Sequence, residues 1–153
     1  MREFGLFLLQ GIPEMVGITG LSLAIAGIPL RWGRILLAGT LLAILIYLIR
    51  LLPFTFGLHT VAGLLLLLFL IIRTTNAPPS WILISVFASF AILAVLEIAV
   101  HEAFFHVTKL NPQEVIDNYP LWIELGLPQT VLLIVLAFLI TRVKQPQKEV
   151  WKV

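Results

Sequence analysis

Long stretches of this chain contain no Asp, Glu, Lys or Arg. They cover residues 15–30, 35–49, 51–72, 74–96 and 125–141, and short polar segments separate them. A membrane-spanning helix needs about 20 predominantly apolar residues, so stretches of this length and composition are typical of such helices. We therefore predict an all-α integral membrane protein, a bundle of about five transmembrane helices.

The expected helices form one polytopic membrane domain over residues 1–153. They cover residues 4–27, 35–52, 58–72, 80–106 and 121–141, and a short basic tail follows at 142–153. Segment 51–57 is predicted to be a turn, because Pro53 breaks a helix and Gly57 loosens the backbone. In the polar segment 109–120, the pattern Asn111-Pro112-Gln113-Glu114 indicates a helix start.

The composition excludes several classes of protein. Hydrophobic residues make up 60% of the chain and charged residues 12%, with a mean hydropathy of +1.07. Ordinary soluble domains contain about 45–50% apolar and about 25% charged residues, so this is not a soluble domain. A net charge of +2 without a long basic run argues against nucleic-acid binding. With no cysteine, the chain has no disulfide, thiolate nucleophile or Cys-ligated metal.

The first apolar stretch has some features of a signal peptide. Arg2 precedes it, and Ala24 and Ala26 are spaced like the small residues of a cleavage site. Pro13 and Glu14 interrupt the stretch, however. We therefore expect a retained helix with a kink near Pro13.

Positive charges predict the orientation of the bundle. With five spans, seven basic residues fall on one side: Arg31, Arg34, Arg73, Arg142, Lys144, Lys148 and Lys152. The other side holds three, Arg2, Arg50 and Lys109. Cytoplasmic loops carry the excess of Lys and Arg, so we expect the N-terminus outside and the C-terminus in the cytoplasm of a multi-pass cell-membrane protein. This assignment depends on the number of spans.

Polar side chains inside the predicted spans fall at one depth, in the outer half of the bilayer. An ionised residue at the bilayer centre costs about 2.5–3.5 kcal/mol on insertion scales, so such residues face the bundle interior and mark function. We predict an outward-facing polar pocket walled by the first, fourth and fifth helices, with Arg50 and His59 at its rim. The predicted ligand-binding residues are Glu14, Arg50, His59, Glu97, His101, Glu124 and Gln129.

Two structural explanations compete with a binding role. Arg50 and His101 lie near predicted helix ends, where long polar side chains reach the interface. Glu14 and Glu97 lie deeper, and each is also explained as part of a purely structural ion pair.

Metal binding is the weaker hypothesis for the same region. The segment His101-Glu102-Ala103-Phe104-Phe105-His106 has one residue more than the H-E-x-x-H zinc motif, so its histidines diverge around the helix. A looser site formed by Glu97, His101 and His59 is the remaining metal hypothesis. Otherwise we predict no cofactor.

Two short segments resemble one another. Gly11-Ile12-Pro13-Glu14 in the first helix matches Gly126-Leu127-Pro128-Gln129 in the fifth, and both helices enter from the same predicted side. Paired Gly/Pro interruptions in corresponding spans mark binding sites in some transporters, although four residues also match by chance. If they form a repeat, we expect the two segments to face one another across the pocket.

In the number of helices, the outer polar pocket and the basic inner tail, the chain resembles the multi-span membrane input regions of bacterial sensor histidine kinases. The resemblance implies a sensory, ligand-binding module. Since no kinase domain follows within the sequence, we expect a stand-alone module that signals through a partner in the membrane or at its inner face.

The predicted partners are therefore the lipid bilayer, a small-molecule or peptide ligand from outside, a signalling partner and further copies of the chain in a homo-oligomer. Two alternatives remain open. One is a small transporter or channel subunit that works as an oligomer or with a partner. The other is a membrane enzyme acting on a lipid or isoprenoid, with Glu97 and His101 as an acid/base pair. We favour a non-enzymatic role, because neither a nucleophile motif nor a phosphate-binding glycine loop accompanies this pair.

Overall fold

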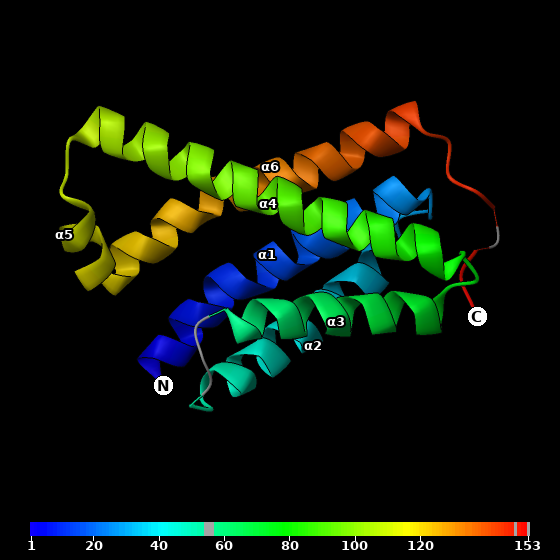
Figure 1. Cartoon of the computed structure of the whole chain (residues 1–153), viewed down its shortest axis with the longest axis horizontal. Coiled ribbons are helices and arrows are strands. Elements are labelled where there is room, and N and C mark those ends of the chain that lie inside the picture. The colour runs from blue at the N-terminus through cyan, green and yellow to red at the C-terminus, as the bar shows by residue number, and fades with distance from the viewer. Residues whose placement is uncertain (54–56, 149, 153) are drawn as a thin grey trace.

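The computed structural model describes residues 1–53, 57–148 and 150–152. Over these residues the chain is helical and forms no strand. The helices are α1 (Arg2–Ala26), α2 (Trp32–Arg50), α3 (Leu58–Thr74), α4 (Pro79–Thr108), α5 (Pro112–Asp117) and α6 (Tyr119–Val143). The five long helices alternate in direction, so the two termini lie at opposite ends of the bundle (Figure 1).

The predicted helix positions agree with these elements to within a few residues. Short helix α5 begins where the sequence indicates a helix start, because the Asn111 side chain accepts a hydrogen bond from the Gln113 backbone N–H. Pro13 and Pro128 lie inside α1 and α6, and neither helix ends there. Part of the predicted turn 51–57, residues 54–56, lies outside the described residues.

Within the described residues, four helices are long and apolar enough to cross a membrane, namely α1, α2, α4 and α6. Helix α3 is also apolar, but its 17 residues extend about 25 Å, less than the roughly 30 Å hydrocarbon core. Over the residues that the structure describes, the protein is thus all-helical with four candidate membrane-spanning helices. The fifth span and the side of each terminus stay predictions.

Helix α1 occupies the middle of the bundle and contacts α2, α4 and α6 (Figure 1). Its residues 15–24 are all buried. Glycines permit this close approach. A Cβ on Gly17 would lie 3.0 Å from the Cβ of Leu133 in α6, and one on Gly39 in α2 would lie 2.8 Å from the Val16 backbone nitrogen. Between helices whose outer surfaces face hydrocarbon, such small-residue contacts supply the attraction that the hydrophobic effect does not.

The C-terminal tail folds back onto the helix ends. We call residues 144–148 and 150–152 the C-terminal strap. Its Gln147 N–H donates to Gly27 O at 3.0 Å, and the Trp151 indole donates to Pro29 O at 2.8 Å. Asn76 N–H donates to Val150 O at 2.7 Å. The strap therefore joins the α1–α2 connection to the α3–α4 connection.

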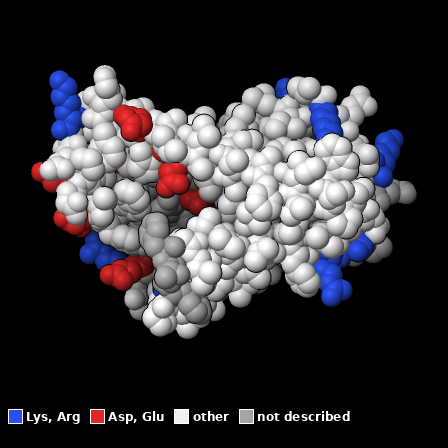
Figure 2. All heavy atoms as spheres, in the orientation of Figure 1, with Lys and Arg blue, Asp and Glu red and all other residues white. Residues whose placement is uncertain are grey.

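Charge is distributed unequally between the two ends of the bundle. The end where the chain terminates carries most of the visible Lys and Arg, whereas the visible Asp and Glu lie at the other end with a few basic side chains (Figure 2). The guanidinium groups of Arg31 and Arg34 lie 6.0 and 5.3 Å from the centre of the Trp151 ring in the strap. The basic residues that the sequence assigns to one side thus share one end of the bundle.

Replacing Gly39 by Ala should destabilise the protein by about 1–3 kcal/mol, since the new methyl group meets the Val16 backbone, which cannot move aside as a flexible side chain would. Thermal or denaturant unfolding in detergent measures the change. Gly33→Ala in the same helix is the control, because no other group lies within 4 Å of its Cβ position. Equal stability of the two variants would contradict the close α1–α2 contact.

Replacing Trp151 by Ala should release the strap. Hydrogen exchange of the Gln147 and Lys152 amides, which donate to Gly27 O and Thr74 O, is then expected to quicken. Gln145→Ala, a change at an exposed strap residue, should leave their exchange rates unchanged. Unaltered protection in the Trp151 variant would show that the indole does not hold the strap.

Candidate functional site

A cavity of about 570 Å³ opens in the half of the bundle away from the strap. Its walls come from α1, α2, α3, α4 and α6. Figure 2 shows a hollow at that end with acidic side chains beside it. Polar side chains in the lining are Gln10, Glu14, Arg50, His59, Thr60, Glu97, Tyr119 and Gln129. This volume is within the usual range of about 300–1,000 Å³ for small-molecule sites.

Five of the seven predicted ligand-binding residues line this cavity, and each comes from a different long helix. They are Glu14 of α1, Arg50 of α2, His59 of α3, Glu97 of α4 and Gln129 of α6. The predicted walls included the first, fourth and fifth long helices, and α2 and α3 complete them. The structure thus brings these side chains together, and their role in binding a ligand stays a prediction.

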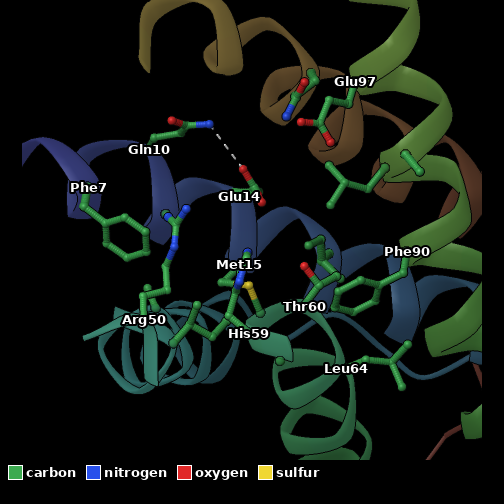
Figure 3. A pocket seen from close by; sticks show the side chains of 18 of the residues that line it. Phe7, Gln10, Glu14, Met15, Arg50, His59, Thr60, Leu64, Phe90 and Glu97 are labelled. Carbon is green, nitrogen blue, oxygen red and sulfur yellow. Dashed lines mark hydrogen bonds between the residues drawn. The ribbon is translucent and has the colours of Figure 1, made fainter. Parts of the chain in front are cut away.

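Glu14 lies at the centre of the polar cluster. Its carboxylate accepts a hydrogen bond from Gln10 Nε2, one turn earlier in α1, at 3.5 Å. It interacts electrostatically with Glu97 and with Arg50, and Figure 3 shows it between these two side chains. Gln10 is not among the ligand-binding residues predicted from the sequence. It lies four residues before Glu14, and this spacing places two side chains on the same face of a helix.

Arg50 is held at the end of α2 by an aromatic neighbour. Its guanidinium carbon lies 5.2 Å from the centre of the Phe7 ring, within the range of a cation–π contact. The Phe7 ring in turn lies 5.2 Å from that of Tyr47 in α2. The α2 side of the cavity therefore combines a cation with aromatic surface.

Gln129 is the most deeply buried polar residue of the site. It is 2% exposed, and its Oε1 atom has no hydrogen-bond partner. Among the described residues the other such side-chain atom is Ser22 Oγ, which is not part of the cavity lining. A buried acceptor without a donor costs about 1–3 kcal/mol, and the Gln129 oxygen is such an unpaired acceptor on a residue of the cavity wall.

The two similar Gly/Pro segments lie against one another. A Cβ on Gly126 would overlap the side chain of Gln10, one residue before Gly11. Glu14 and Gln129, the last residues of the two segments, line the same cavity. The last residues of both segments therefore border one cavity, and the internal repeat with its facing arrangement stays a prediction.

His101 and Glu124 do not line the cavity. The His101 Nδ1 donates to the Glu97 backbone oxygen at 2.6 Å, and its ring centre lies 5.1 Å from that of Trp122. Glu124 is exposed on α6. His101 thus packs behind the wall, against a lining aromatic residue.

The geometry does not favour the metal hypothesis. Within the part of the chain that the structure describes, no three His, Asp or Glu side chains converge as ligands of one ion. Glu97, His101 and His59 therefore do not form a three-ligand site there.

The sequence does not predict several of the lining residues, because they are of types common throughout membrane helices. Phe90 and Leu93 of α4 and Trp122 of α6 supply apolar wall. Trp122 and Tyr119 belong to the first turn of α6, whose start is fixed by the Asn118 side chain accepting from Leu121 N–H at 3.4 Å. Aromatic residues at a helix end are typical of the membrane interface, so their type alone does not distinguish a wall of a pocket.

Comparison of the chain with protein families, with curated proteins and with solved structures finds no match.

If the cavity is open to water, a cysteine at position 97 or 129 should react with a water-soluble maleimide in nanodiscs. The chain has no native cysteine, so each single variant gives one signal. A cysteine at Val131, which is 59% exposed on the apolar surface of α6, should react far more slowly because lipid covers it. A cysteine at Asn111 in the polar segment is the positive control. Equal, slow labelling at 129 and 131 would show that the cavity is closed to water.

Proposed function

We propose that the protein is a membrane module that binds a small ligand in this cavity and senses its presence. In this proposal five helices cross the bilayer, the strap is cytoplasmic and the cavity opens to the outside. The excess of Lys and Arg at the strap end supports that orientation through the positive-inside rule.

The observation that carries the proposal is the convergence of polar groups on one cavity. Side chains from five helices meet there, although polar groups in a membrane bundle are costly. A structural ion pair would explain Glu14 and Arg50. It would not explain the cavity itself, nor a buried Gln129 oxygen without a donor. A bound ligand would account for the polar side chains, for the cavity and for the unpaired Gln129 oxygen.

The other half of the bundle favours binding over passage. Between the cavity and the strap, large aliphatic side chains with under 2% exposure fill the interior, and they include Leu21, Ile35, Leu42, Leu67, Ile71, Ile82 and Leu133. Interiors packed in this way leave no room for a solute. This arrangement suits a site that is entered and left from the same end.

Helix α1 gives a physical connection between the cavity and the strap. It carries Glu14 in the cavity wall, and its last turn accepts strap hydrogen bonds: Lys144 Nζ donates to Ile25 O at 2.8 Å. Gly27, directly after the helix, accepts from Gln147. A ligand that shifts α1 would therefore change the strap contacts, which is the property a sensor needs.

Native mass spectrometry of the protein released from membranes tests the proposal. We expect a bound small molecule, and we expect Gln129→Trp to abolish it by filling the cavity. Val135→Trp, at a 44% exposed position on the same helix, should keep it. Hydrogen exchange at the strap amides should differ between loaded and emptied protein.

Two results would overturn the proposal. One is protein without any bound molecule. The other is a molecule held equally by both tryptophan variants, which would be a surface lipid. Solute flux into protein-containing vesicles above that of empty ones would instead assign the transporter alternative.

A further inference from the structure

Hydrogen-bond acceptors from three helices line one cavity, and one of them has no donor. Three acceptor groups come from three helices: the carboxylates of Glu14 in α1 and Glu97 in α4, and the Gln129 oxygen in α6. Gln10 donates one hydrogen bond to Glu14, whereas the Gln129 oxygen has no donor at all. A ligand group that pairs with the Gln129 oxygen must be a donor.

Charge in the same cluster indicates a cation. Glu14 and Glu97 interact electrostatically, and two carboxylates of like charge repel one another. Arg50 and His59 lie on the other side of Glu14 from Glu97 in Figure 3, and the Arg50 guanidinium faces the Phe7 ring. On the Glu97 side, a positive charge between the two acids would offset their repulsion.

The remaining wall indicates an organic cation and not a bare metal ion. Apolar and aromatic side chains such as Met15, Ile18, Leu64, Phe90 and Trp122 make up much of the lining. Hard metal ions such as Ca²⁺ prefer six or more oxygen ligands, and 570 Å³ is far more space than one ion occupies. Aromatic faces also attract organic cations.

We propose that the ligand of this cavity is an amphipathic amine whose ammonium group is bound by Glu14, Glu97 and Gln129. An ammonium carries three donors, which matches three acceptor groups, and one positive charge, which lies between two carboxylates. Its apolar body lies against Met15 and Phe90. This inference rests on the proposed function and adds the chemical class of the ligand.

Matched probes test the ammonium directly. Three sets share a butyl, phenylethyl or octyl body, and each set contains the primary amine, the alcohol and the N-acetylated amine. The readout is protection of a Thr60→Cys variant in nanodiscs from a maleimide, since Thr60 lines the cavity and is exposed. We expect the amine of at least one set to protect at a concentration about tenfold or more below its neutral partners, as loss of a charge-assisted hydrogen bond predicts.

Charge-matched variants identify the binding groups. Glu14→Gln, Glu97→Gln and Gln129→Leu should each weaken protection by the amine about tenfold or more. Glu124→Gln removes the same charge from an exposed position outside the cavity and should have little effect. Gln129→Leu should leave the empty protein at least as stable as before, because it removes an unpaired acceptor.

Each unfavourable outcome overturns a distinct claim. Neutral probes that protect as well as the amines would leave a binding cavity but refute the ammonium, as would sodium chloride alone giving the same protection. Amines that do not protect the Thr60→Cys variant in any set also refute it, and a bound non-amine found by native mass spectrometry would then preserve the proposed function. If Glu124→Gln weakened protection by the amine as much as Glu97→Gln does, the effect of Glu97 would come from surface charge and not from binding in the cavity.

Discussion

The central position of α1 is the constraint on which the rest of the structure depends. A helix that contacts three neighbours at once needs small residues where the backbones approach, and Gly17 of α1 and Gly39 of α2 permit such contacts of α1 with α6 and α2. This packing fixes the depth of Glu14 relative to the other four long helices. Without it, the acidic and amide groups of α1, α4 and α6 would have no common cavity.

Two halves of the bundle differ in what fills them. Toward the strap, aliphatic side chains interlock and backbone hydrogen bonds join the connections between helices. Toward the other end the helices leave a cavity, and polar side chains occupy its wall. Such a division is typical of proteins in which a rigid framework holds a less tightly packed binding region, because sites that exchange a ligand need local freedom to open.

Much of the fold follows from the sequence, because hydropathy and Pro/Gly positions determine where membrane helices begin and end. The sequence also predicted which polar residues share the cavity, because residues at the same depth of neighbouring spans come together when the spans alternate in direction. These residues are Glu14, Arg50, His59, Glu97 and Gln129. Hydropathy does not show how helices rotate about their axes, so His101 was placed inside the cavity although it packs behind the wall against Trp122. The strap could not be predicted, because it is held by hydrogen bonds to backbone carbonyls such as Gly27 O. Every residue has such a carbonyl, so the sequence gives no signal for these contacts.

The contact between Val16 and Gly39 has a mechanical consequence for α2. It fixes α2 against α1 at Gly39, and the Phe7 ring of α1 contacts Tyr47 and Arg50 further along α2. Gly39 and Arg50 lie 11 residues apart, about 16 Å along the helix axis, so α1 holds α2 at two separate levels. A rotation of α2 about the Gly39 contact would therefore have to separate Arg50 from the Phe7 ring in the cavity wall.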